Sequence, residues 1–67
     1  MVTLTVNGKA IEIQHEMTVA AFLAAREVDA KHVAVARNGE VIERDAYAEL
    51  VLHAGDVVEI VRMVGGG

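Results

Sequence analysis

The sequence predicts an α+β fold in which one helix packs across one face of a small mixed β-sheet. Two Asn-Gly pairs, Asn7-Gly8 and Asn38-Gly39, each stand between segments that favour strands, and Asn-Gly is a strong short-range signal for a β-hairpin. Between these two turns the apolar spacing changes from a period of two residues to that of a helix. A last strand-like run follows the second turn.

The first hairpin joins residues 1–6 to residues 10–14. Val2, Leu4 and Val6 alternate with other residues before the turn. Alternation with β-branched residues is typical of a half-buried strand. After the turn the same pattern returns at Ile11 and Ile13. We therefore expect all of these side chains to face one core.

The helix is expected to begin at Val19, with Thr18 as its N-cap. Val19, Phe22 and Leu23 have the i, i+3, i+4 spacing of one helical stripe. The alanines around that stripe are good helix formers. Residues 29–31 end the helix without a glycine, so its exact end stays open.

Three further strand segments are expected after the helix. The run of valine and alanine at residues 33–36 is typical of a central strand that is covered on at least one face. The second Asn-Gly turn leads from it into Val41-Ile42. Residues 49–52 are expected to hold a short edge segment, and residues 53–56 have the composition of a turn.

The last predicted strand covers residues 57–64. Val58 and Ile60 share one face with Arg62. The opposite face carries Val57, Glu59, Val61 and Met63. Apolar residues on both faces are expected where one side of a strand lies in the core and the other is partly open to a partner.

The usual rules for connections between strands predict one arrangement of these strands and the helix. A right-handed crossover through the helix places the last strand beside the first, in the middle of the sheet. The result is a β-grasp, ubiquitin-like arrangement with a mixed sheet of four to five strands. We assign residues 1–64 to this domain and expect residues 65–67 to form a flexible glycine tail.

Composition narrows the classes of function. The chain has no cysteine and no serine, so disulfides, a thiol nucleophile and a serine triad are all excluded. Its formal net charge is −4, and no basic patch with aromatic residues suggests a nucleic-acid partner. No signal peptide and no apolar run near the roughly 20 residues of a membrane span are present. We expect a cytoplasmic protein that is monomeric when free and does not bind membranes.

The titratable side chains do not form a catalytic set. The histidines stand beside turns, and none is spaced like a pair of metal ligands. They are His15, His32 and His53. Two carboxylate pairs are interpreted as solvated charge that discourages edge-to-edge strand pairing. These pairs are Glu40 with Glu43 and Asp56 with Glu59. We therefore expect no enzymatic activity, no catalytic residue, no metal site and no cofactor.

The remaining chemical candidate is the final run, Gly65-Gly66-Gly67. Because glycine has no Cβ, Gly66 and Gly67 can lie extended in a tunnel too narrow for other residues. The group delivered there is the α-carboxylate of Gly67, which can be activated as an acyl-adenylate with ATP and then attacked by a sulfur nucleophile. Without cysteine, the protein could hold transferable sulfur only as a thiocarboxylate at this position. On the tail alone, a frayed or artificial terminus remains the alternative.

Three segments together resemble a known family. Residues 4–8 (LTVNG), 33–42 (VAVARNGEVI) and 55–67 (GDVVEIVRMVGGG) are similar to the ThiS-type sulfur carriers of thiamine biosynthesis, and the last segment matches best. The resemblance implies a β-grasp fold and adenylation of the C-terminal glycine by an E1-like enzyme of the ThiF type. It further implies conversion to a thiocarboxylate with sulfur from a cysteine desulfurase, and transfer of that sulfur to thiazole synthase (ThiG).

The resemblance also suggests functional residues. Gly67 becomes the modified residue, Gly66 its neighbour in the tunnel of the partner, and Gly65 a spacer in the threading tail. Partner docking is assigned to exposed residues beside the tail, for which ordinary strand packing is the alternative interpretation. These residues are Val61, Met63 and Val64.

Other functions share parts of this description. A MoaD-type carrier for molybdopterin synthesis uses the same tail chemistry, as do carriers for cysteine synthesis or tRNA thiolation. A ubiquitin-like protein modifier shares the activation step but forms an isopeptide bond. A non-catalytic β-grasp interaction module would bind through a face of the domain and would not need the tail.

Overall fold

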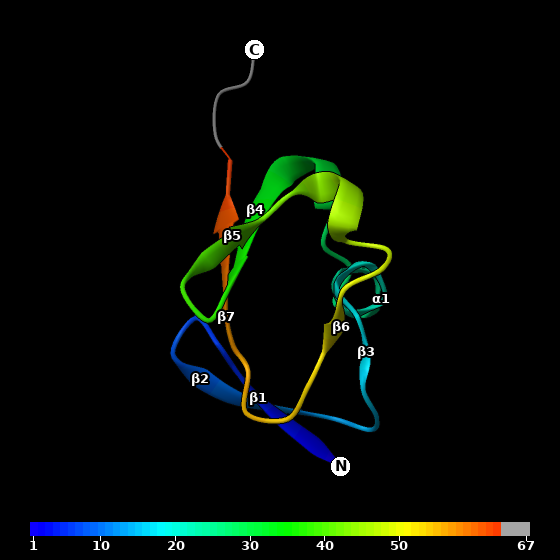
Figure 1. The fold of residues 1–67 in the computed structure, drawn as a ribbon, viewed down its shortest axis with the longest axis vertical. Coiled ribbons are helices and arrows are strands. Elements are labelled where there is room, and N and C mark those ends of the chain that lie inside the picture. The colour runs from blue at the N-terminus through cyan, green and yellow to red at the C-terminus, as the bar shows by residue number, and fades with distance from the viewer. Residues whose placement is uncertain (64–67) are drawn as a thin grey trace.

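A computed structural model describes residues 1–63 of the chain and contains a five-stranded mixed sheet with one α-helix (Figure 1). The strand order is β2-β1-β7-β4-β5. The β-grasp class predicted from the sequence is confirmed. The sheet strands are β1 (Val2–Val6), β2 (Lys9–Ile13), β4 (Val33–Arg37), β5 (Glu40–Ile42) and β7 (Val57–Arg62). The other elements are β3 (Met17–Thr18), α1 (Val19–Ala25), β6 (Val51–Leu52) and 3₁₀ helices at Ala30–His32 and Arg44–Ala46.

Both Asn-Gly hairpins are confirmed. β1 pairs antiparallel with β2 from Val2↔Ile13 to Val6↔Lys9, and β4 pairs antiparallel with β5. Asn7 and Gly8 have φ values of 50° and 83°, and the second turn repeats this conformation. Positive φ at both central residues gives a two-residue turn whose twist matches that of the strands.

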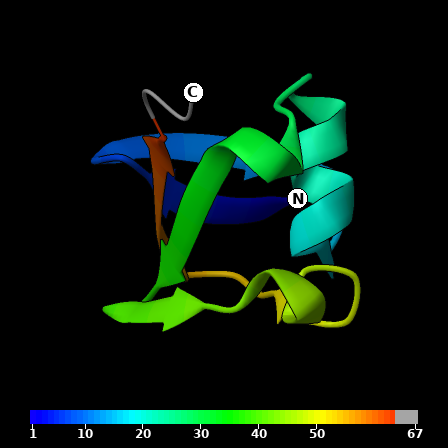
Figure 2. The ribbon, with the colours of Figure 1, turned by 90° about the horizontal axis from the view of Figure 1, so that it is seen from above.

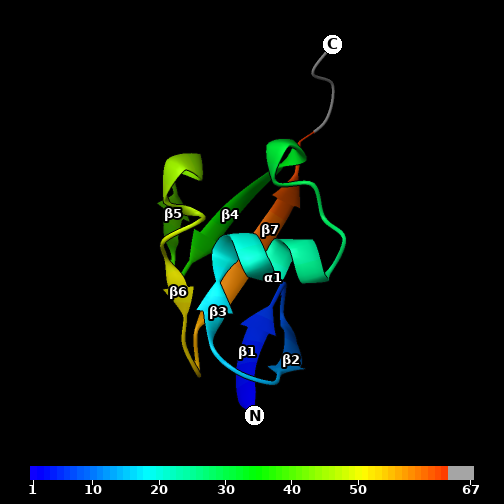
Figure 3. The same cartoon turned by 90° about the vertical axis from the view of Figure 1, so that its right-hand side faces the viewer.

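The core lies between the sheet and α1, which crosses in front of the sheet in Figure 3 and lies to one side of it in Figure 2. The predicted apolar stripe of the helix is fully buried, and the inward residues of the central strands meet it. The buried side chains are Leu4, Val6, Val19, Phe22, Leu23, Val33, Val35, Tyr47, Leu52 and Val58. All except Tyr47 are aliphatic or Phe, so the core is stabilised mainly by apolar burial.

Thr18 caps the helix as predicted, since its side chain accepts a hydrogen bond from the Ala21 N–H. The helix ends at Ala25, however, before the expected residues 29–31. Glu27 adopts a left-handed conformation with φ of 59°, and the Val28 N–H donates to the Leu23 carbonyl at 2.9 Å. This is a Schellman-type end, and its usual glycine signal is absent because glutamate occupies the left-handed position.

The segment at residues 49–52 differs from the expected sheet edge. β6 pairs with β3 in a separate two-stranded ladder, through Met17↔Leu52 and Thr18↔Val51. Leu52 is fully buried in the core. The ladder therefore ties the start of α1 to the chain that leads into β7.

Tyr47 is the residue whose role the sequence did not indicate. Its side chain is 4% exposed, and its hydroxyl accepts a hydrogen bond from the Val35 N–H at 3.2 Å. The polar residues around it in the sequence gave no periodic signal of burial.

Among the residues described, no helix has the length and hydropathy to span a membrane.

The left-handed Glu27 gives a direct stability prediction. Glu27→Gly should raise the free energy of unfolding by about 1 kcal/mol, because glycine adopts positive φ without a Cβ clash. Glu27→Ala is the matched control, since it removes the same side chain but keeps the clash, and it should give no such gain. Urea unfolding of the three proteins measures the difference, and equal stabilities of the Gly and Ala variants would contradict this account.

Candidate functional site

β7 leads to the glycine tail and is paired on both sides. It runs parallel to β1 through Thr5↔Val57 and Val6↔Val58. It runs antiparallel to β4 from Arg37↔Val58 to Val33↔Arg62, and the Met63 N–H donates to the His32 carbonyl at 2.8 Å. The predicted central position of the last strand is therefore confirmed, and the strand leaves the sheet at one end of the molecule (Figure 1).

Several predictions fall beyond this point. β7 ends at Arg62, and Met63 is the last residue that the structure describes. The strand predicted to reach Val64, the tail at Gly65-Gly66-Gly67 and their assigned roles lie outside the described residues. The predicted boundary between residues 1–64 and 65–67 also lies outside the described residues.

The two faces of β7 have the predicted parity. Val58 is 1% exposed and Ile60 packs against the core, whereas Val61 and Met63 are 61% and 52% exposed. Because neighbouring side chains of a strand point to opposite faces, the two exposed residues share the side that faces away from α1. Both predicted docking residues within the described part of the chain are thus accessible.

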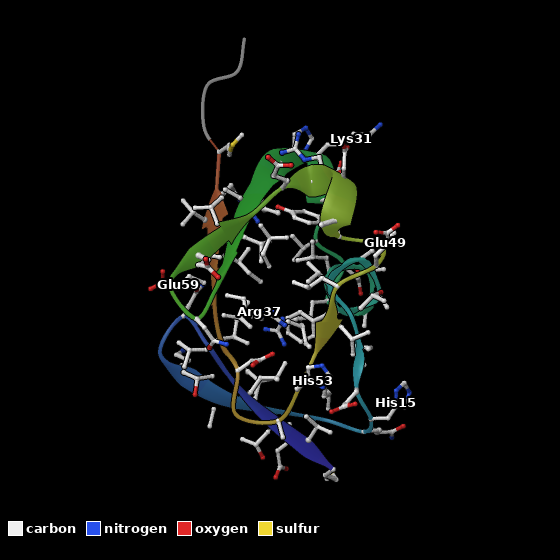
Figure 4. The ribbon with its side chains drawn as sticks, in the orientation of Figure 1. His15, Lys31, Arg37, Glu49, His53 and Glu59 are labelled. Atoms are coloured by element: carbon white, nitrogen blue, oxygen red, sulfur yellow. The ribbon has the colours of Figure 1, made fainter. Side chains whose placement is uncertain are left out.

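Val61 borders a shallow hollow on this outer face of the sheet. The hollow has a volume of about 190 Å³. Ala34, which is paired with Val61, and Ala36 also line it. Val41 from β5, 78% exposed, and Glu59 form other parts of the wall. Figure 4 shows Glu59 pointing away from the helix.

The outer face also has a simple charge pattern. Leu4 and Val6 of β1 point into the core. The residues next to them in β1 therefore point outward, and so do the β2 residues paired with those. These outward residues are Thr3, Thr5, Ala10 and Glu12. Among the strand residues of this face in the described chain, the charged ones are Glu12 and Glu59. Among the described strand residues, this face is therefore mainly apolar over β7, β4 and β5, and its two charged groups are acidic.

The side chains of the two turn asparagines hold β7. The side-chain oxygen of Asn7 accepts from the Ile60 N–H at 2.8 Å, and its amide nitrogen donates to the Ile60 carbonyl at 3.2 Å. Asn38 contacts the other end of the strand, where its side-chain oxygen accepts from the Val57 N–H at 2.9 Å. The sequence indicated these asparagines only as turn formers, because their partners are far away along the chain.

Asp56 organises the turn before β7, so its interpretation as a solvated edge charge was wrong. Its carboxylate accepts from the His53 N–H at 2.8 Å and from the Asn38 side chain at 3.1 Å, and it lies 3.6 Å from the Arg37 guanidinium. Burial alone acts to raise the pKa of Asp56. The hydrogen bonds from His53 and Asn38 and the charges of Arg37 and His53 outweigh that effect and leave the pKa below its ordinary value.

The histidines lie at the surface, as predicted. His53 Nδ1 is 2.7 Å from a carboxylate oxygen of Glu16, and His32 Nδ1 is 3.4 Å from Asp29. Figure 4 shows His15 and His53 toward the end of the molecule opposite the C-terminal end of β7. Across residues 1–63, no three acidic or histidine side chains gather as a group that could hold a metal ion.

Comparison with known sequences gives consistent matches. The chain matches the model of the ThiS family over residues 4–67. Sulfur carrier protein ThiS of Bacillus subtilis is 40% identical over 65 residues, which are 96% of this chain and 98% of that protein. Thiazole synthase of Paramagnetospirillum magneticum is 41% identical over 64 residues, 96% of this chain, but the match spans only 20% of that protein.

Solved structures agree with the sequence matches. The crystal structure of the thiamine biosynthesis protein ThiS from Geobacter metallireducens superimposes with a TM-score of 0.87 at 39% identity, covering 98% of this chain and all of that one. The solution structure of a thiamine biosynthesis protein from the same organism gives a TM-score of 0.80 at 39% identity, covering 88% of its chain.

The low pKa of Asp56 predicts an acid-dependent loss of stability. A carboxyl group whose pKa is lower in the folded than in the unfolded chain stabilises the fold while ionised. This contribution is present above the unfolded pKa of about 4, and it is lost as the pH falls through the folded pKa. Asp56→Asn should therefore be less stable at pH 7 and should lose less stability below pH 4. Urea unfolding at a series of pH values measures both, and parallel pH profiles would exclude Asp56 as the cause.

Proposed function

This chain belongs to the ThiS family of sulfur carrier proteins, and from this premise we propose that Gly67 is the residue on which it carries sulfur. It is a carrier and not an enzyme. The observation that supports this function best is the position of β7, which is paired on both sides and exposes Val61 and Met63 directly before the glycine tail. Such a strand presents its following residues from a fixed base.

The proposed chemistry takes place at the carboxylate of Gly67. A carboxylate oxygen attacks the α-phosphate of ATP, and pyrophosphate leaves as the glycyl-adenylate forms. The outer sulfur of a persulfide on the donor protein then attacks the acyl carbon and AMP departs, which leaves an acyl disulfide. A second thiol cleaves the S–S bond and forms a disulfide with the donor sulfur, so the thiocarboxylate is released with sulfur in place of one carboxylate oxygen. The carrier supplies no catalytic group to these steps. Gly65 and Gly66 serve to thread a narrow tunnel, which side chains larger than hydrogen would block.

Three partners follow from this scheme. We propose a ThiF-type enzyme for adenylation, a cysteine desulfurase as the source of sulfur, and thiazole synthase as the sulfur acceptor. The similarity of this chain to a segment of a protein named thiazole synthase supports the last of these. The relatives named for thiamine biosynthesis favour that pathway over molybdopterin synthesis. Because activation consumes ATP, we place the reaction in the cytoplasm.

Partner docking is proposed for the exposed side of the β7 end. Val61 and Met63 present an apolar surface there. Val64, which follows them in the sequence, is proposed as a third docking residue. When a partner covers exposed apolar groups beside a reactive tail, the burial of their surface stabilises the complex. The acidic groups of the same face, Glu12 and Glu59, suit a partner with a basic rim.

The carrier mechanism predicts a change in intact mass. Incubation with ATP, a ThiF-type enzyme, a cysteine desulfurase and cysteine should increase the mass by the difference between sulfur and oxygen. Deletion of Gly67, or addition of one residue after it, should abolish the increase without unfolding the domain. The Bacillus subtilis relative serves as the positive control for the enzymes. An unchanged mass while that control reacts would exclude the proposed function.

The docking surface predicts a separate kinetic effect. Val61→Lys should raise the KM for the carrier in the adenylation reaction about tenfold, because it places a charge in an apolar contact. Its kcat should stay near that of the unmodified protein, since the reacting carboxylate is unchanged. Val57→Lys is the matched control, because Val57 is also exposed on this face but stands at the opposite end of β7. Equal KM values for the two variants would remove Val61 from the docking surface.

A further inference from the structure

We propose that Asn7 is a positioning residue for sulfur carriage, because its side-chain amide takes the place of a further β1 residue beside β7 and fixes the strand end that presents the tail. The inference rests on the function proposed above. Besides forming the turn, Asn7 would hold the end of β7 in the orientation that the adenylating enzyme accepts.

β1 supports β7 only along the first part of β7. Their parallel ladder ends at Val6 and Val58, and the Asn7 N–H donates to the Val58 carbonyl at 2.9 Å. At Asn7 the backbone takes a positive φ of 50° and turns toward β2. β1 therefore offers no further backbone to the part of β7 that leads to Met63.

The Asn7 side chain continues this support of β7 at Ile60. A primary amide carries an acceptor oxygen and a donor nitrogen, as a peptide group does. In Asn7 the oxygen accepts from the Ile60 N–H at 2.8 Å, and the nitrogen donates to the Ile60 carbonyl at 3.2 Å. Both polar backbone groups of Ile60 are thus satisfied by one side chain. An aspartate could not do the same, because its carboxylate has no donor for the Ile60 carbonyl.

Support of β7 from both sides defines the direction of the strand end that precedes the tail. On the β4 side, β7 is paired as far as Arg62, and Met63 is bonded to His32. A strand held along one side only can tilt about that side, whereas contacts on both sides define its direction. If a fraction of the molecules presents the strand end wrongly, the apparent affinity of the enzyme falls by that fraction. The chemical step in correctly seated molecules is unaffected.

The second Asn-Gly turn provides a matched control within the same chain. Asn38 has a φ of 52° and also bonds to β7 through its side chain, but its partner there is Val57, at the start of the strand. Glycine adopts positive φ readily. Asn7→Gly and Asn38→Gly therefore keep both turns and remove side-chain contacts at opposite ends of β7. Each variant loses two side-chain hydrogen bonds, because Asn7 makes both of its bonds to Ile60 and Asn38 bonds to Val57 and Asp56.

The experiment compares initial rates of adenylation with a ThiF-type enzyme over a range of carrier concentrations. Asn7→Gly should raise KM about 3- to 10-fold, the scale of one or two hydrogen bonds, with kcat within about twofold of the unmodified protein. Asn7→Asp should raise KM in the same way, because it keeps the size of the side chain but lacks the donor. Asn38→Gly should leave KM within about twofold. Circular dichroism at the assay temperature confirms that each variant is folded.

Amide hydrogen exchange gives a readout that does not depend on the enzyme. Asn7→Gly should accelerate exchange at Ile60 selectively, and Asn38→Gly should do so at Val57. Equal KM values for the two glycine variants, or a lower kcat with unchanged KM in Asn7→Gly, would overturn the positioning role while leaving the sulfur carrier function intact. Failure of the unmodified protein to be adenylated, with the Bacillus subtilis relative reacting normally, would overturn the proposed function and this inference with it.

Discussion

The pairing of β7 on both of its edges is the constraint on which the rest of the structure depends. A strand in the middle of a sheet must have its N–H and C=O groups satisfied from two directions, and here the partners are β1 on one side and β4 on the other. Each partner also belongs to a hairpin whose Asn-Gly turn holds β7 with a side chain. The first and last segments of the domain are thereby joined, and local unfolding of the strand end is opposed by contacts from both halves of the chain.

One face of β7 contributes to the stability of the fold, and its other face is available for recognition by a partner. Val58 lies in the core with the residues of α1, whereas Val61 and Met63 point outward. The alternation of a strand makes this division possible within a few residues. A domain of this size buries only about 60% of the surface that its unfolded chain exposes, so its core is small. Here one strand both contributes to that core and displays the contacts beside the tail. This arrangement suits a carrier, whose reactive group must be presented to an enzyme and not enclosed.

Polar contacts complete a core that has no disulfide to stabilise it. The Tyr47 hydroxyl accepts from the Val35 N–H at the inner side of β4, and the Asp56 carboxylate accepts from the backbone of the turn before β7. These groups lie in segments without regular long elements. The Val35 N–H is a buried donor, and it would cost about 1–3 kcal/mol if it were left unpaired. The Asp56 contact fixes the conformation of a more exposed turn. Irregular loops of this small domain are thus fixed by a few specific acceptors.

The sequence alone determined the hairpins, the start of the helix, the inward and outward residues of β7 and the family to which the chain belongs. Each of these depends on neighbours a few residues apart: alternation at Val2, Leu4 and Val6, the cap at Thr18, and the closing glycine motif. Only the tertiary structure decided the end of α1 at the left-handed Glu27, the pairing of β3 with β6, the burial of Tyr47 and the contact of Asn7 with Ile60. Except for the helix end, these features join residues far apart along the chain, and local periodicity carries no information about such partners. The helix end escaped prediction because glutamate stands where the local signal would have been glycine.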